Sequence, residues 1–433
     1  MPLPMLRALA HRNYRLYFAG QAISLVGTWM QQVAMSWVVY QLNHSSLQLS
    51  IVLFAGQIPS LFLSPLAGVL VDRYHRHRVL LLTQSLAMVQ ALLLALLTWT
   101  GRYDVWQLVL LSLFLGLVNT FDMTTRQAFL SELVNRREDL GNAIALNSSI
   151  VNGARLIGPT LAGFILAQTS ADVCFLLNGL SYLAVLLALL AMRLDKPPRP
   201  RAAAPLWQGF QEGFRYVSGF APIRILLLLL GLSSMTGMSY TVLLPEFTVR
   251  RLGGDARTLA FLTAASGLGA LAGALFLASR KSVLGLGRWL FLALTLLGLG
   301  LVAFAAVSHF TPALFVLFVI GFGMMVQMAS SNTLLQTLSA EDKRGRVMSF
   351  YTMAFLGMAP LGNLLTGTLA AWLGPQITLL INGSLCLGGA ACFGLYLPRL
   401  RVQVRPIYVR LNILPPLASG VAAASELENV VKE

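Results

Sequence analysis

Twelve long apolar runs constrain the fold of this chain more than any other feature of its sequence. Each run has about the 20 residues that an α-helix needs to cross the hydrocarbon core of a bilayer. They fall at 17–42, 47–71, 79–100, 105–125, 143–168, 173–192, 223–247, 259–278, 289–308, 312–333, 348–373 and 377–397. With 57% hydrophobic and 11% charged residues, a soluble domain has too little polar surface to cover this apolar area. We therefore predict an all-α polytopic membrane protein with twelve transmembrane helices.

The distribution of basic residues predicts how these helices are oriented. Of 31 Lys and Arg, 26 fall on segments on the same side of the membrane as the N-terminus. Four lie on the other side, Arg102, Arg250, Arg251 and Arg257, and Arg155 lies inside the fifth run. Since basic residues collect in cytoplasmic loops, both termini are predicted to be cytoplasmic, in a multi-pass protein of the cell (inner) membrane. The net charge of +15 is scattered over many short loops, which argues against nucleic-acid binding.

The second six runs partly repeat the first six. Three glycines of the fifth run recur 204 residues later in the eleventh, Gly153, Gly158 and Gly163 matching Gly357, Gly362 and Gly367. Six-helix repeats of this kind build a cavity at the membrane midplane between two bundles. We predict an N-terminal bundle at 1–192, a linker at 193–222, a C-terminal bundle at 223–398 and a cytoplasmic tail at 399–433.

The linker and the tail both combine basic and apolar residues. After a Pro-rich stretch, the linker places apolar residues at helical spacing, at Trp207, Phe210, Phe214 and Val217. This spacing predicts an amphipathic helix on the membrane surface. The tail alternates arginines with apolar residues and then becomes polar, which predicts a membrane-surface segment followed by disorder.

The loop after the second run carries a charged motif. One glycine is followed by an acid and three arginines, Gly68, Asp72, Arg73, Arg76 and Arg78. The motif resembles the loop signature of the major facilitator superfamily, which implies a charge cluster that holds a cytoplasmic gate closed. The sequence departs from that signature at His75, where glycine is usual, and at His77, where a basic residue is usual. The alternative is an ordinary positive-inside loop. We expect no metal site at the two histidines, because arginines flank both.

The fourth run ends with an acid and an arginine four residues apart, Asp122 and Arg126, on one helix face. The same resemblance implies that Asp122 pairs with Arg76 or Arg73, which leaves Arg126 facing Asp72. A local ion pair between Asp122 and Arg126 is the alternative.

The fifth run contains a glycine-proline motif similar to the antiporter motif of exporters in the superfamily. Its residues are Gly153, Gly158, Pro159 and Gly163, with Ala162 where the motif has glycine. The resemblance implies export. Small residues at this spacing also allow close helix packing, and proline bends a helix, so a purely structural role is the alternative.

Arg155 lies deep within the same run. An arginine near the centre of a span costs roughly 2.5–3.5 kcal/mol on insertion scales, so it should face protein or water. Gln31 and Gln32 in the first run lie at a similar depth and are its candidate partners. With Asn119 of the fourth run, these residues form our candidate cavity lining, although structural hydrogen bonding of Arg155 is the alternative.

Two further segments narrow the resemblance within the superfamily. The run Gly27-Thr-Trp-Met-Gln31-Gln32 and the later Arg344-Gly-Arg346-Val resemble the siderophore-exporter-like and macrolide-efflux-like branch of drug:proton antiporters. The resemblance covers nearly the whole chain. It implies an antiporter that exports a small amphipathic drug or siderophore by alternating access, in exchange for protons. We expect the protein to be a monomer.

Other functions stay open or are disfavoured. No acidic residue lies clearly at the midplane where a proton-coupling carboxylate belongs, so a non-proton-coupled or importing facilitator is the main alternative. A transport-inactive membrane sensor is another. We expect no enzyme and no cofactor, because the five histidines are dispersed and neither Gly-x-Ser-x-Gly nor His-Glu-x-x-His occurs.

Overall fold

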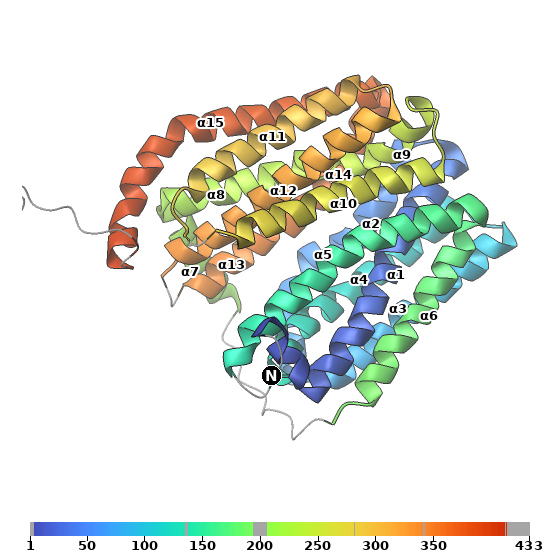
Figure 1. Cartoon of the computed structure of the whole chain (residues 1–433), viewed down its shortest axis with the longest axis horizontal. Helices are drawn as coiled ribbons and strands as arrows, with labels where there is room; N and C mark the ends of the chain where they lie inside the picture. Colours follow the sequence, from blue (N-terminus) through green and yellow to red (C-terminus); the bar gives the residue numbers. More distant parts are fainter. Residues whose placement is uncertain are drawn as a thin grey trace, which may run out of the picture.

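The computed structural model describes residues 4–134, 137–193, 206–280, 282–340, 343–411 and 413, and these residues form helices and turns without strands. The first half of the chain forms α1 (Arg12–Asn43), α2 (Ser46–Arg73), α3 (Arg76–Thr100), α4 (Val105–Phe129), α5 (Arg137–Gln168) and α6 (Ala171–Leu190). The second half forms α8 (Ala221–Leu232), η3 (Ser233–Gly237), α9 (Tyr240–Arg250), α10 (Ala256–Ala278), α11 (Leu286–Ala306), α12 (Phe310–Leu338), α13 (Arg344–Thr352), η4 (Met353–Gly357), α14 (Met358–Leu373) and α15 (Pro375–Arg410). Figure 1 shows the two halves as two bundles of nearly parallel and antiparallel helices.

The predicted twelve-helix membrane architecture is confirmed. In the described residues, eleven helical segments are long and apolar enough to cross a bilayer. The twelfth is α1, which has 32 residues and a more polar composition, and which packs along α5 and α6. Two spans are interrupted by a π-helical turn, α8–η3–α9 at Ser233–Gly237 and α13–η4–α14 at Met353–Gly357. Each interruption lies near the middle of its span, the seventh and the eleventh, and a π-turn changes the direction that the following side chains face.

Short sequence signals set several helix ends. Ser45 accepts a hydrogen bond from the backbone of Gln48 at the start of α2, and Asp255 accepts one from Thr258 at the start of α10. Gly101 ends α3 with a φ of +65°, a left-handed conformation that favours glycine. Short local sequence signals therefore determine where these spans begin or end.

The last helix is longer than the sequence predicts. The tail was expected to begin at 399, yet α15 continues without a break to Arg410, with Pro398 and Pro406 inside it. Leu400 and Val404 are buried in the hydrophobic core, so tertiary packing holds this segment helical. The rest of the predicted tail, from 414 to 433, lies outside the described residues.

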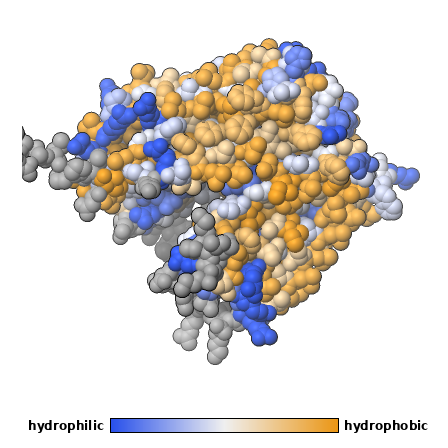
Figure 2. All heavy atoms as spheres, in the orientation of Figure 1, coloured by the Kyte–Doolittle hydropathy of each residue, from blue (hydrophilic) through white to orange (hydrophobic). Residues whose placement is uncertain are grey.

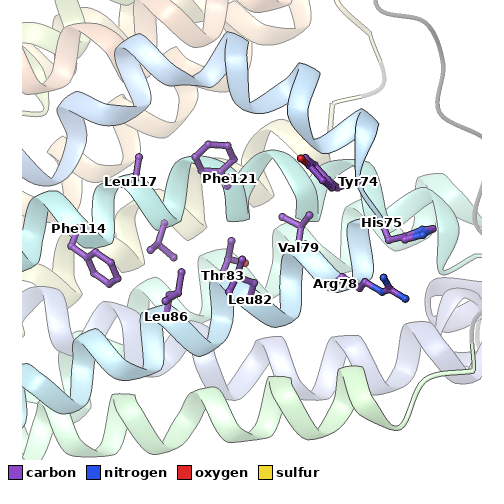
Figure 3. A pocket seen from close by; sticks show the side chains of 11 residues that line it. Tyr74, His75, Arg78, Val79, Leu82, Thr83, Leu86, Phe114, Leu117 and Phe121 are labelled. Atoms are coloured by element: carbon purple, nitrogen blue, oxygen red, sulfur yellow. The ribbon is translucent and has the colours of Figure 1, made fainter.

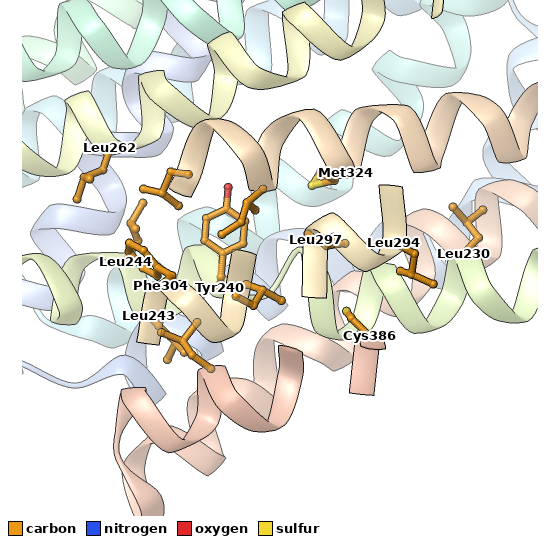
Figure 4. Close-up of a cluster of buried hydrophobic side chains, with 14 of the residues drawn as sticks. Leu230, Tyr240, Leu243, Leu244, Leu262, Leu294, Leu297, Phe304, Met324 and Cys386 are labelled. Atoms are coloured by element: carbon orange, nitrogen blue, oxygen red, sulfur yellow. The ribbon is translucent and has the colours of Figure 1, made fainter. Parts of the chain in front are cut away.

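Each half has its own arrangement of helix contacts. In the first half, α1 and α3 both pack on α6, while α4 packs on α2 and α3. In the second half, α12 packs on α10 and α11, and α11 packs on α15. Figure 4 shows the interior of this second bundle, where side chains such as Tyr240, Leu297 and Phe304 meet. The Phe304 ring stacks on Phe247 at 4.4 Å between centroids.

The outer surface matches a bilayer environment. Figure 2 shows apolar residues over the middle of both halves, with hydrophilic residues gathered at their ends. Large apolar side chains that face outward include Trp372, which is 81% exposed, and Leu395, which is 82% exposed. Exposed apolar side chains of this size carry no free-energy cost when they contact the hydrocarbon chains of a bilayer.

The predicted amphipathic linker helix is present as α7 (Leu206–Gly219), while residues 194–205 lie outside the described part. It docks on α13 of the second half. Glu212 forms ion pairs with Arg346 and with Lys343, the latter at 3.7 Å, and the Phe214 ring lies 6.4 Å from the Phe350 ring. The linker is therefore anchored to the C-terminal bundle.

Candidate functional site

The seam between the two bundles is the natural place for a transport site. Two helix pairs form most of it, α2 with α14 and α5 with α10. We call the end of the molecule with the N-terminus, the α2–α3 loop and α7 the basic end, and the opposite end the distal end. In Figure 1 the two bundles lie close together toward the distal end and diverge toward the basic end, beside the N-terminus and α7.

The glycine-proline motif of α5 lies on this seam. A β-carbon added at Gly158 would lie 2.8 Å from the backbone oxygen of Val26 in α1, and one at Gly163 would overlap the Ala260 side chain of α10. Pro159 lies between them inside the helix. Around Gly153, by contrast, nothing lies within 4 Å of such a β-carbon. Two of the three motif glycines thus allow α5 to approach α1 and the opposite half closely.

The repeated glycines of α14 make the equivalent contacts. Gly362 packs on Met235 and Ser239 of the seventh span, and a β-carbon at Gly367 would lie 3.0 Å from the backbone oxygen of Ser46 in α2. Each set therefore brings one glycine to the first helix of its own bundle and another to the opposite bundle. The sequence repeat corresponds to a structural repeat across the seam.

A buried carboxylate joins the two halves at the distal end. Ser46, at the start of α2, donates a hydrogen bond from Oγ to Glu246 of α9. Glu246 also pairs with Arg250 at 3.2 Å, one helical turn further along. Glu246 is 5% exposed and Ser46 is 3% exposed. No local sequence pattern links Glu246 to a serine in the other half, so the sequence alone does not predict this contact.

Arg155 lies on α5 where that helix faces α10. Its guanidinium stands over the Trp29 ring at 5.3 Å from the centroid, and a β-carbon added at Gly267 of α10 would lie 2.8 Å from its backbone oxygen. Among the described residues, no hydrogen bond or ion pair is formed by the Arg155 side chain, which is half-buried. A cation over an aromatic face is stabilised, yet its N–H donors stay free for another partner.

The other candidate cavity residues divide into two groups. Gln31 is buried inside the first bundle, where it donates to Gln90 at 3.2 Å and accepts from Asn178 at 2.7 Å. These bonds join α1 to α3 and α6, so the Gln31 side chain is not available to Arg155. Gln32 and Asn119 are both exposed. Asn119 lies two residues before Phe121, and so on nearly the opposite face of α4.

The charges of α4 pair differently from what the loop motif implies. Asp122 binds Arg126 at 2.7 Å and accepts hydrogen bonds from Thr83 and Gln84 of α3. Arg76 instead pairs with Glu132 at 2.7 Å. The expected pair between Asp122 and Arg76 is therefore absent from this structure, and the local alternative is the one observed. The i, i+4 spacing lets Arg126 reach Asp122 without crossing between helices.

The remaining motif residues lie at the end of α2 and in the loop that follows. Gly68, Asp72 and Arg73 belong to α2, and the side chains of Asp72 and Arg73 lie outside the described residues. Arg78 is exposed in the first turn of α3, and the His77 ring bonds the backbone oxygen of Leu189 at 2.9 Å. Within the part of the chain that the structure describes, no three His, Cys, Asp or Glu side chains are grouped to hold a metal ion.

Solved structures share this fold. A peptide transporter of the POT family superposes with a TM-score of 0.73 at 11% sequence identity, covering 90% of this chain and 95% of its own. A bacterial homologue of the human lysosomal transporter Spinster, solved inward-facing and unoccupied, has a TM-score of 0.62 at 13% identity, covering 94% and 97%. These similarities support the fold of the two bundles.

Curated relatives are similar over most of their length. The staphyloferrin A transporter of Staphylococcus aureus is 28% identical, over 85% of this chain and 92% of its own. The multidrug efflux pump Tap of Mycolicibacterium fortuitum is 28% identical, over 85% and 91%. The enterobactin exporter EntS of Escherichia coli is 29% identical, over 94% and 95%.

A family model matches nearly the whole chain. The model described as transmembrane secretion effector matches residues 5–408, from the first described turns to the end of the last helix. The match includes the glycine-proline motif on α5, the loop between α2 and α3 and both halves of the seam. The curated relatives described above are transporters. The chain therefore belongs to the transmembrane secretion effector family of the major facilitator superfamily.

Proposed function

We propose that this protein exports a small amphipathic compound, a drug or a siderophore, across the cell membrane by alternating access in exchange for protons. Two of the relatives, an enterobactin exporter and a multidrug efflux pump, support this direction and substrate range. In this proposal the protein acts as a monomer. Both termini are cytoplasmic, so the basic end faces the cytoplasm, in accord with the distribution of Lys and Arg.

The observation that carries the proposal is the symmetry of the seam. Gly163 meets α10 and Gly367 meets α2, so each bundle contributes one close-packed contact to the other. Two contacts related by the internal repeat can act as pivots about which the halves rock. In the present state the seam is joined at the distal end by Ser46 and Glu246, which corresponds to an inward-facing transporter in the proposed orientation.

We assign the substrate contact to Arg155, with Gln32 and Asn119 as further lining residues. The Arg155 guanidinium has free donors and lies over the Trp29 ring at the seam. An amphipathic substrate with an acidic group and an apolar or aromatic body fits this pair, because the guanidinium binds the acid and the indole contacts the ring. The α2–α3 loop with Gly68, Asp72 and Arg73 stays our proposed gate at the basic end.

Proton coupling needs a carboxylate that changes its surroundings during transport. Asp122 and Glu246 are two buried acids of the described transmembrane helices, at 3% and 5% exposure, and a third, Asp139 at the start of α5, already pairs with His11 at 3.0 Å. Glu246 is the stronger candidate, since its bond to Ser46 must break when the distal end opens. A Glu246→Gln variant should lose transport driven by a pH gradient while it keeps substrate exchange without a gradient.

The test is transport by the purified chain in proteoliposomes. We expect movement of anionic compounds, including carboxylate and catecholate siderophores, that is driven by a proton gradient and reduced by Arg155→Gln. Arg257→Gln is the control, because that arginine also stands over an aromatic ring, Phe261, at 5.7 Å, but near the distal surface. Absence of flux for every compound, with a folded protein, would refute the proposal. Equal flux by wild type and Arg155→Gln would refute only the assignment of the substrate contact.

A further inference from the structure

A groove lies on the outside of the first bundle, away from the seam. It has a volume of about 500 Å³ and runs between the end of α2 and the facing sides of α3 and α4. Figure 3 shows Tyr74, His75 and Arg78 together toward one end of the groove, with Leu86 and Phe114 toward the other. A cavity of this size is within the usual range for a bound small molecule.

The groove opens toward the bilayer. Leu82 on α3 and Leu117 on α4 are 60% and 41% exposed at its rim. The same faces of the two helices continue as exposed apolar side chains toward the distal end, at Val89, Leu93 and Leu113. The inner wall is buried and includes Thr83, whose hydroxyl donates to Asp122. A molecule in the groove therefore contacts lipid on one side and the helix pair α3 and α4 on the other.

The polar groups of the groove are confined to the basic end. Arg78 is exposed there, and among the described residues it forms no ion pair. His75 beside it is exposed and has a ring N–H donor in either tautomer. No described lining residue is acidic, and the lining beyond Thr83 is apolar. The groove thus presents a cation at the membrane surface and an apolar channel in the hydrocarbon region.

We propose that this groove binds an anionic phospholipid. Arg78 and His75 hold the phosphate of the headgroup, and one acyl chain lies along Leu82, Leu86 and Phe114. A phospholipid matches both the position of the charge and the depth of the apolar channel, because its headgroup and chain are fixed at these two levels of a bilayer. A bound lipid braces the turn after α2 against α4 and so acts on the proposed gate. The leaflet is cytoplasmic if the orientation proposed above holds, but the binding itself is independent of transport.

Lipid binding can be measured on the full chain without any transport assay. Native mass spectrometry of the purified protein compares phosphatidylglycerol with phosphatidylcholine of identical acyl chains. A basic residue at the membrane surface contributes about fivefold in affinity for anionic lipid, so wild type should prefer phosphatidylglycerol by about that factor. Arg78→Gln should abolish the preference, and Arg78→Lys should retain it. Leu117→Trp, which fills the exposed rim, should weaken binding of both lipids.

Arg102→Gln is the matched control, because Arg102 is an exposed arginine at the distal end. It should leave the preference unchanged, and thermal unfolding confirms that each variant is folded. Equal binding of both lipids by wild type, or an unchanged preference in Arg78→Gln, would overturn the proposal. If neither lipid bound and an exported compound protected the groove, the proposal would be overturned. The groove would then be assigned to substrate entry. Soluble glycerol phosphate should not compete, since it lacks the acyl chain.

Discussion

Ser46 and Glu246 are 200 positions apart in sequence, yet the serine hydroxyl donates to the glutamate carboxylate across the two halves of the molecule. Both side chains are buried. A hydrogen bond to a charged group contributes about 1.5–3 kcal/mol, enough to change a two-state population about tenfold or more. This contact therefore stabilises the state in which the distal end is closed.

Ser46→Ala is expected to favour opening of the distal end. Spin labels at Asn43 and Arg251, both exposed there, should report a longer distance in the variant, in a background where the exposed Cys392 is replaced by serine. Ser279→Ala is the control, because the Ser279 hydroxyl is exposed and bonds only within its own helix at 2.7 Å. An identical distance distribution in wild type and Ser46→Ala would show that the bond does not hold the end closed.

Gly163→Val should disturb the seam, whereas Gly153→Val should be tolerated. Both glycines belong to the same motif on α5, but only Gly163 faces the packed surface of α10. Overpacking typically costs about 1–3 kcal/mol. We expect lower transport and a lower melting temperature for Gly163→Val alone. Similar losses of transport and of melting temperature in both variants would show that packing against α10 is not what makes Gly163 sensitive.

Asp122→Asn should destabilise the first bundle by about 3 kcal/mol, at the low end of the cost of breaking a buried ion pair. The cost is limited because Arg126 also donates to Gln21 at 2.9 Å. Glu132→Gln should cost less than about 1 kcal/mol, since its pair with Arg76 is partly exposed on both sides. Melting in detergent, followed by tryptophan fluorescence, compares the two. Equal destabilisation would mean that burial does not decide the strength of these pairs.

Asp255 gives a prediction about pH. Its hydrogen bond from the Thr258 backbone lowers the pKa of this carboxyl below the ordinary value of 3.8. A carboxyl whose pKa is lowered on folding contributes stability above its unfolded pKa, and that contribution is lost as the pH falls through the folded pKa. Asp255→Ala should cost about 1 kcal/mol at neutral pH, and the difference from wild type should shrink below about pH 4.

The control for this prediction is Asp255→Asn, because asparagine also caps helices and does not titrate. Its stability relative to Asp255→Ala should stay constant across the same pH range. A wild-type advantage that persists at low pH would show that the capping carboxylate is not the source.

The sequence by itself determined the number, order and approximate limits of the membrane helices. Hydrocarbon forces every spanning segment to satisfy its backbone internally, so length and apolarity alone identify a span such as α11. The depth of Arg155 and the repeat of Gly163 at Gly367 also follow from position along a helix. These features are local, and local periodicity is visible in one dimension.

Tertiary structure alone decided which side chains meet. Gln31 and Gln32 are neighbours in sequence, but helix rotation turns the first into the bundle toward Asn178 and leaves the second exposed. The partner of Asp122 depended on where Arg76 meets α4, since Arg76 donates to the Ala128 backbone and pairs with Glu132 instead, and the partner of Glu246 depended on how the two bundles close. Such contacts join helices far apart in the chain, and small residues at the crossing points set their spacing, so no local pattern encodes them.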